Sequence, residues 1–218
     1  MRKDLRRQGI GSKLWKAIVA SCGDRNISLD GVSAMVPWYT KQGFVWKGHS
    51  IQQHSVRVSQ AMKIGKQYPL LKVPPVSDGL WPPVMDYDRQ VYPDVDRCTR
   101  ERILRAFFTQ AGVHAVVAME GEIVVGYGSV HRKDIQDKFG IRFLHADNTD
   151  VVDVILNTLL KDVPVGLTLY FWSIVGKTLP TYLNVESGKT VEPFHRMYTK
   201  SQLDINVSKI WLTSAHIV

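Results

Sequence analysis

The chain has 218 residues, of which 44% are hydrophobic and 22% are charged, so it is long enough for one large globular domain or two small ones. Its longest apolar runs, such as residues 166–175, are too short to cross a bilayer, and the basic N-terminus leads into no apolar signal region. We therefore expect a cytoplasmic protein with no membrane partner. Its two cysteines, Cys22 and Cys98, form no disulfide framework or metal-ligand pattern, and we expect both to be reduced.

The net charge of +8 is concentrated in the first third of the chain. Residues 1–66 carry 12 Lys/Arg against 3 Asp/Glu, whereas residues 67–218 carry 16 against 17. A basic segment suggests a polyanionic partner, either nucleic acid or a phosphorylated cofactor such as coenzyme A, and the alternative is a solvated basic surface with no ligand. The sequence contains no groove-reading module, and no aromatic residues are interleaved with the basic ones, so a nucleic-acid partner is the less favoured interpretation.

The first segment predicts a helix followed by strands. Apolar residues recur at helical spacing over residues 9–22, and residues 26–32 are typical of a short strand. A proline that opens a turn and a glycine that closes it predict a brief helix over residues 37–42. Residues 44–46 and 55–62 then predict a pair of strands.

Prolines, with a Ser-Asp-Gly run among them, predict a linker over residues 66–84. The charge balance changes at the same place. We therefore expect three parts: a domain over residues 1–65, the linker, and a second domain over residues 85–218 with a complete sheet of its own.

The second segment alternates helices and strands. The run Glu120-Gly121-Glu122, flanked by apolar runs, predicts a hairpin. The expected elements are mostly helix over 86–112, the hairpin 114–119 and 123–131, a strand at 141–144, a helix at 151–160, a strand at 166–175, a helical turn at 181–184, and strands at 191–199 and 209–214. This order predicts an α/β fold, a mixed sheet covered by helices.

A phosphate-binding loop is indicated at the start of the first helix. Gly9 and Gly11 follow two arginines, and glycines at a helix N-terminus let successive backbone N–H groups point at one anion. The run lacks the four-residue gap of a P-loop, and Leu14 stands where a dinucleotide fingerprint needs its third glycine. It matches the pattern Arg/Gln-x-x-Gly-x-Gly/Ala.

Two ordered motifs carry a family resemblance. The phosphate pattern is followed by Leu29-Asp30-Gly31-Val32 and then by Tyr39-Thr-Lys-Gln-Gly43-Phe44. Together they resemble the GNAT superfamily of N-acyltransferases, and in detail the YitH/HolE-type enzymes, which carry a GNAT domain and a divergent second one. The region downstream is similar to that second domain, in Tyr87-Asp88, Asp96-Arg97, Gly126-Tyr127-Gly128, Ala146-Asp147 and Pro193-Phe-His-Arg-Met-Tyr198.

The resemblance implies an acetyl-CoA-dependent N-acetyltransferase that acts on a primary amine of a small molecule or peptide. It implies that Tyr39 protonates the CoA thiolate as general acid; a packing role for this tyrosine is the alternative. It also implies that backbone and side chains of the first loop hold the CoA pyrophosphate, namely Arg6, Arg7, Gln8, Gly9, Ile10, Gly11 and Ser12.

Two features depart from the family pattern. Val32 stands where many members have asparagine, and only five residues precede Arg6, where a complete domain has further strands and helices. We therefore expect the C-terminal portion of a GNAT domain with impaired or no activity, and we name no general base. The alternative is a non-catalytic remnant that binds CoA or a protein partner. An exposed sheet edge would favour self-association.

The second domain is expected to be degenerate and to lack the cofactor site. Between its strand at 141–144 and its helix at 151–160 stand His145-Ala-Asp147-Asn-Thr-Asp150, with no glycine and with two aspartates that repel a pyrophosphate. His145 and Asp147 have no third ligand for a metal, so we expect no metal site. His195 and Arg196 are candidates for a groove between the two segments.

Overall fold

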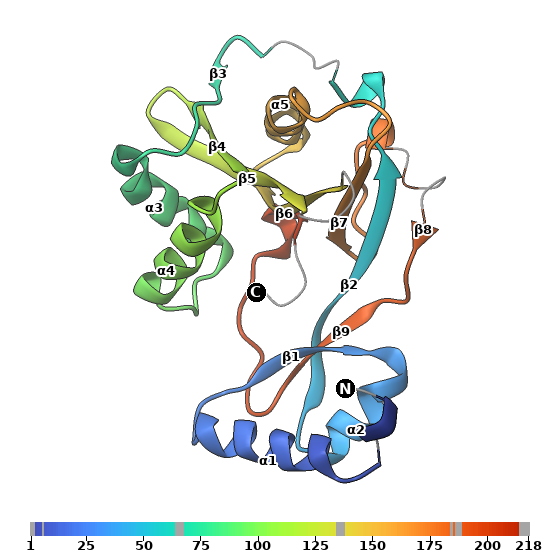
Figure 1. Cartoon of the computed structure of the whole chain (residues 1–218). Helices are drawn as coiled ribbons and strands as arrows, with labels where there is room; N and C mark the ends of the chain where they lie inside the picture. The colour runs from blue at the N-terminus through green and yellow to red at the C-terminus, as the bar shows by residue number, and fades with distance from the viewer. Residues whose placement is uncertain are drawn as a thin grey trace.

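The computed structural model describes residues 3–5, 7–63, 68–133, 138–183, 185 and 189–213. Within these ranges the strands form one ten-stranded mixed sheet, and α-helices lie against it (Figure 1), so the predicted α/β fold is confirmed. The strands are β1 (Ser28–Val32), β2 (Val45–Arg57), β3 (Leu71–Lys72), β4 (Val113–Glu120), β5 (Ile123–Lys133), β6 (Lys138–Ala146), β7 (Thr168–Ile174), β8 (Lys189–Thr190), β9 (Phe194–Tyr198) and β10 (Ile210–Leu212). The α-helices are α1 (Ile10–Cys22), α2 (Val36–Lys41), α3 (Trp81–Val91), α4 (Arg97–Phe108) and α5 (Thr149–Leu160).

The sheet runs in the order β1-β9-β2-β7-β6-β5-β4-β3, with β10 beside β6 and β8 beside β2. Neighbouring strands are antiparallel except for β6 and β7, which are parallel over their first three pairs, from Lys138–Thr168 to Gly140–Tyr170. The predicted hairpin is present as β4 and β5, whose register closes at Glu120 opposite Ile123.

Two apolar cores lie on opposite faces of β4, β5 and β6. The helix α5 covers one face with residues at helical spacing, including Val152, Ile155 and Leu159, which are fully buried. The helices α3 and α4 cover the other face, where Val84, Leu104 and neighbouring aromatic rings pack. Figure 1 shows α1 and α2 apart from these layers, beside the end of the sheet made by β1, β9 and β2.

The expected pair of strands at 44–46 and 55–62 is wrong. One strand, β2, runs from Val45 to Arg57. The end of the second expected strand lies instead in a 3-10 helix, Gln60–Lys63. The middle of β2 contains the run Lys47-Gly-His-Ser50. The strand stays extended because its first half pairs with β9 along one edge and its second half pairs with β7 along the other edge, so each half has one edge hydrogen-bonded.

The linker predicted over 66–84 also contains regular structure. A short strand, β3, pairs with the end of β4, Pro75 bridges Val116, and α3 begins at Trp81 with prolines in its first turn. The extended chain therefore adds an edge to the sheet before it enters the helix.

Strands from the two ends of the sequence are interleaved. The strand β9 lies between β1 and β2, and the second half of β2 lies beside β7. The expectation that residues 85–218 have a complete sheet of their own is wrong, because β9 has both its neighbours in residues 28–51 and β7 has β2 on one edge. The division at residues 66–84 stays a prediction.

Candidate functional site

The start of α1 presents uncapped backbone donors. Gly9 precedes the helix with φ 75° and ψ 0°, a left-handed conformation that glycine adopts without strain, and Arg7 also has a positive φ of 65°. The Gly9 carbonyl accepts the first helical bond, from Lys13 N–H at 3.0 Å. No side chain caps the helix among the described residues, so the N–H groups at Ile10 and the following positions remain available to an anion.

The predicted phosphate-loop residues gather around this helix end and face solvent. Ile10 is half-buried, while Arg7, Gln8, Gly9, Gly11 and Ser12 are exposed. A Cβ added to Gly9 would meet no described atom within 4 Å, so a ligand has room to approach. Gln8 is turned back, since its Nε2 donates to the Asp4 carbonyl at 2.9 Å. Arg6 lies outside the described residues.

Tyr39 is held on α2 by an aromatic cluster. Its ring centroid lies 5.7 Å from that of Trp15, 5.2 Å from that of Trp38 and 6.2 Å from that of Phe44. The ring also covers Gly31 of β1, with Cδ2 3.1 Å from the place where a Cβ would stand. A larger residue than glycine would displace Tyr39. The half-buried ring is therefore packed, while none of the described residues hydrogen-bonds its hydroxyl.

The apolar stripe that predicted α1 is not the side that packs on the sheet. Leu14 and Ile18 are 59% and 58% exposed. The residue that packs is Trp15, which follows Leu14 in the sequence. Its ring contacts the rings of Trp38, Tyr39 and Phe44. Apolar residues at helical spacing predict that a helix forms, but they do not determine which of two adjacent faces is covered.

A histidine that the sequence offered only as a groove candidate lies beside this site. His195 of β9 stands opposite Gly31 of β1 and opposite Ser50 of β2. Its Nε2 is 3.0 Å from the Ser33 hydroxyl and its Nδ1 is 2.9 Å from the Ser50 hydroxyl. Sequence reasoning missed this trio because its members come from three distant segments. Only the His195-Arg196 pair in a short strand hinted at it.

The corresponding helix start in the second half is closed to anions. Asn148 caps α5, and its side-chain oxygen accepts from Val151 N–H at 3.0 Å. Asp147 forms an ion pair with Lys209. The hollow of about 260 Å³ beside this end is lined by Glu120, Asp147 and Asp150, among other residues, and so repels a phosphate.

The gap where β6 and β7 diverge is also filled by the chain itself. Beyond Gly140 the two strands separate, and β10 pairs with β6 through Ile210 and Leu212. Thr213 closes the other side through two backbone hydrogen bonds with Trp172 of β7, at 2.9 and 3.2 Å. Backbone groups that a ligand would need are thus already bonded.

Comparison with known proteins agrees with this arrangement of strands and helices. Residues 1–64 match the family model of the acetyltransferase (GNAT) domain. No curated protein sequence matches the chain. Among solved structures, a proposed acetyltransferase from Pyrococcus horikoshii superposes with a TM-score of 0.70 at 20% identity, over 99% of this chain and 68% of the other. The chain has a GNAT fold.

Two further structures extend the comparison. A GCN5-related N-acetyltransferase from Anabaena variabilis has a TM-score of 0.60 at 16% identity, covering 89% of this chain and 51% of its own length. A tandem GNAT protein from the clavulanic acid biosynthesis pathway has a TM-score of 0.60 at 13% identity, covering 90% and 71%. The chain thus spans half to about two thirds of these GNAT structures.

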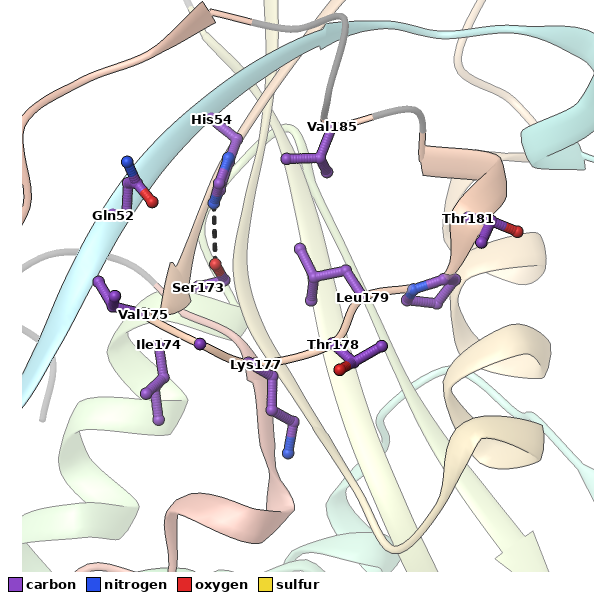
Figure 2. A pocket seen from close by; sticks show the side chains of 12 residues that line it. Gln52, His54, Ser173, Ile174, Val175, Lys177, Thr178, Leu179, Thr181 and Val185 are labelled. Carbon is purple, nitrogen blue, oxygen red and sulfur yellow. Dashed lines mark hydrogen bonds between the residues drawn. The ribbon is translucent and has the colours of Figure 1, made fainter.

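A second serine–histidine pair lines a cavity at the far half of β2 in this GNAT fold. Figure 2 shows His54 and Ser173 joined by a hydrogen bond of 2.8 Å between Nε2 and the hydroxyl, at the edge of a cavity of about 460 Å³. Both side chains are buried, and burial lowers the pKa of His54. Lys177 also lines this cavity, but its ammonium group donates hydrogen bonds to the Val207 and Ser208 carbonyls.

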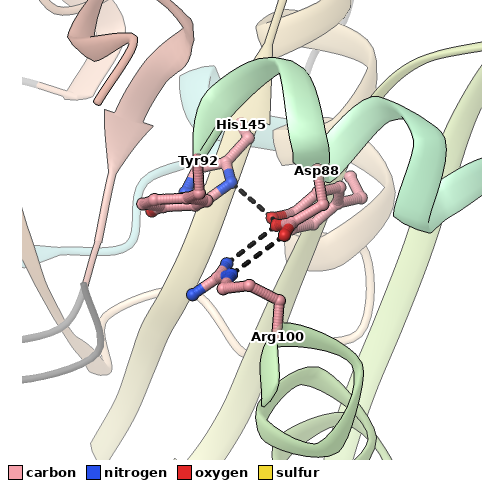
Figure 3. A network of polar contacts seen from close by, with 5 residues as sticks. Asp88, Tyr92, Arg100 and His145 are labelled. Carbon is pink, nitrogen blue, oxygen red and sulfur yellow. Dashed lines mark hydrogen bonds and ion pairs between the residues drawn. The ribbon is translucent and has the colours of Figure 1, made fainter. Parts of the chain in front are cut away.

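A buried polar network lies between α3, α4 and the sheet (Figure 3). Arg100 donates two hydrogen bonds to Asp88, at 2.7 and 2.9 Å, and Tyr127 donates a third at 2.5 Å. Because a carboxylate only accepts, the Tyr127 proton points to Asp88, and His145 Nδ1–H must donate to the Tyr127 oxygen, 2.6 Å away. His145 Nε2 then accepts from Tyr92, at 3.3 Å. Within the described residues these groups bond to one another, and a hollow of about 420 Å³ beside them is lined by Asp88, Tyr92 and Arg100, among other residues.

The described ranges contain neither a metal-binding cluster nor a membrane-spanning helix. Over the described ranges, no group of three or more His, Cys, Asp or Glu side chains could hold a metal ion. In that part of the chain no helix is both long and apolar enough to cross a bilayer.

Proposed function

We propose that this protein is an acetyl-CoA-dependent N-acetyltransferase whose acceptor is the primary amine of a small molecule or peptide. The observation that carries the proposal is the start of α1, where Arg7 and Gly9 in left-handed conformations lead into uncapped helix donors. It lies within residues 1–64, the segment that matches the GNAT acetyltransferase domain. Acetyl-CoA is the co-substrate of that family.

In the proposed reaction each end of the cofactor meets one element. The backbone N–H groups of Gly9, Ile10 and Gly11, with the neighbouring side chains of residues 6–12, hold the pyrophosphate against the positive end of α1. Tyr39 supplies a proton to the thiolate that leaves when the amine attacks the thioester carbonyl. The aromatic cluster fixes its ring, and no described residue bonds its hydroxyl, which is the donor in this step.

We further propose a tandem arrangement of the YitH/HolE type, in which only the first half binds CoA. The capped start of α5 and the strand β10 between β6 and β7 support this assignment. The second half then contributes structure to the first, since β9 lies beside β1.

A second candidate function is CoA or partner binding without turnover. It is favoured by β1, which pairs with β9 on one edge and with no other described strand. In the GNAT family the neighbour on that other edge grips the pantetheine arm. That edge, unpaired among the described strands, also suits association with another chain.

The test has two arms. Binding is measured by the rise in melting temperature with CoA, and turnover by thiol release from acetyl-CoA in the presence of a panel of amines. Binding with multiple turnovers supports the enzyme. Binding without turnover favours the second candidate, and an unchanged melting temperature contradicts the enzyme and CoA binding alike, leaving only the binding of another chain.

A further inference from the structure

The cluster of Ser33, His195 and Ser50 lies near the C-terminal end of β1, which Tyr39 of α2 also contacts. Ser33 follows the last residue of β1 and begins the short 3-10 helix Ser33–Met35 that leads into α2. Tyr39 lies on α2. His195 and Gly31 are register partners, so their Cβ positions lie on one face of the sheet, about 4.5–5.5 Å apart in such pairs. Tyr39 covers that face at Gly31.

The imidazole is oriented by two hydroxyl groups. Ser50, its register partner on β2, contacts Nδ1 at 2.9 Å, and Ser33 contacts Nε2 at 3.0 Å. The Ser33 hydroxyl is 3.5 Å from the Pro193 carbonyl, so the imidazole nitrogen is its nearer acceptor. An imidazole held by one partner at Nδ1 while Nε2 faces a hydroxyl has the geometry of a base that withdraws a proton through that hydroxyl.

We propose that Ser33, His195 and Ser50 form a proton relay that accepts the proton of the acceptor amine during acetyl transfer. The inference rests on the proposed acetyltransferase function and supplies the base that the motifs did not identify. Ser33 contacts the amine, His195 receives the proton through Ser33, and Ser50 positions the ring. All three are at least partly accessible, since each is half-buried.

The amine nitrogen attacks the thioester carbon, a C–N bond forms, and the C–S bond breaks. The amine gives a proton to Ser33 Oγ while Ser33 gives its own proton to His195 Nε2, and His195 Nδ1–H remains bonded to Ser50. Tyr39 gives its proton to the departing sulfur. Transfer of the proton from the imidazolium to the tyrosinate, through solvent, restores both groups, and the products are the amide and CoA.

The experiment compares His195→Gln and Ser33→Ala with the wild-type chain. We expect kcat for thiol release to fall about 10²–10⁴-fold in both variants, with the KM for acetyl-CoA and the CoA-induced rise in melting temperature retained. The other serine–histidine pair provides the matched control: His54→Gln and Ser173→Ala should keep kcat. Ser33→Ala removes a single oxygen, so it reports the relay even if His195→Gln destabilises the fold.

A second readout separates the relay from a structural role. Weakly basic acceptors such as hydrazine form an adduct whose N–H loses its proton to water more readily, so the loss in His195→Gln should shrink about tenfold with them. Normal kcat in His195→Gln and Ser33→Ala overturns the relay and leaves the proposed function standing. Acetylated Ser33 detected by intact mass also overturns it, in favour of a nucleophilic serine. CoA binding without turnover in the wild type overturns the proposed function and the relay together.

Discussion

The guanidinium of Arg196 donates two hydrogen bonds to the carboxylate of Asp30, at 2.6 and 2.8 Å, and so joins two strands 166 residues apart. Both side chains are 1% exposed. The pair spans β1 and β9 in register, on the face opposite His195. The first and last parts of the chain are therefore linked both by backbone pairing and by a buried ion pair.

The first prediction concerns this ion pair. Asp30→Asn keeps the shape but leaves the Arg196 charge buried without its counter-ion, so we expect a loss of about 3–5 kcal/mol in the free energy of unfolding. Asp86→Asn breaks the exposed pair with Arg97, whose side chains are 67% and 42% exposed, and should cost less than about 1 kcal/mol. Urea unfolding of the two variants tests this, and equal losses would contradict it.

The second prediction concerns folding as one unit. A fragment of residues 68–218 lacks β1 and β2, so β9 loses both neighbours and β7 loses one. We expect this fragment to show no cooperative thermal transition, and the whole chain to unfold in one. Calorimetry of both proteins decides the matter. A cooperative transition in the fragment would restore the expectation of a self-contained second domain.

The third prediction concerns the phosphate loop. Gly9→Glu places a carboxylate at the anion site and forces a side chain onto a φ of 75°. It should abolish the thermal stabilisation by CoA, which amounts to about 2.7 kcal/mol at 100 times the dissociation constant. Gly112→Glu is the matched control, since Gly112 has the same φ of 75° and open surroundings far along the chain. A CoA response lost equally in both would count against the site.

The fourth prediction concerns the general acid. Tyr39→Phe keeps the aromatic cluster and removes the proton, so kcat should fall about 10²-fold or more while the melting temperature stays nearly unchanged. Tyr182→Phe, which removes a hydroxyl bonded to Asp153 at 2.7 Å, serves as the control and should keep kcat. Unchanged kcat at saturating acetyl-CoA in Tyr39→Phe would leave this tyrosine with a packing role.

Local signals in the sequence predicted most elements but not their neighbours. The hairpin of β4 and β5 and the helix α5 follow from patterns within a dozen residues, and they were predicted correctly. The placement of β9 between β1 and β2 depends on partners more than 140 residues away, for which a single sequence carries no signal. For the same reason Gly9 and Tyr39 could be selected from motifs, whereas the contact of His195 with Ser33 could not.

One buried and one half-buried histidine, His145 and His49, should make the fold sensitive to acid. Burial, opposed by Asp88 and reinforced by Arg100, lowers the pKa of His145 to about 3, and burial with Arg196 lowers that of His49 to about 4. In the unfolded chain a histidine titrates near about 6.5. Between these pH values the unfolded chain binds more protons than the folded one. The contribution of these histidines to the free energy of unfolding is therefore fully present above about pH 6.5 and is lost as the pH falls.

The fifth prediction gives this loss a size and a test. Each of the two histidines should lower the free energy of unfolding by about 1.4 kcal/mol for each pH unit below about pH 6.5, until the pH approaches the pKa of that histidine in the folded state. Protonation of His145 would place a positive charge on a ring that is 0% exposed, and the loss of hydration of that charge sets the direction. Urea midpoints at pH 7, 6 and 5 measure the slope, and His145→Gln should reduce it by one histidine's share. A free energy of unfolding that is flat from pH 7 to pH 5 would show that these rings take up protons in the folded state.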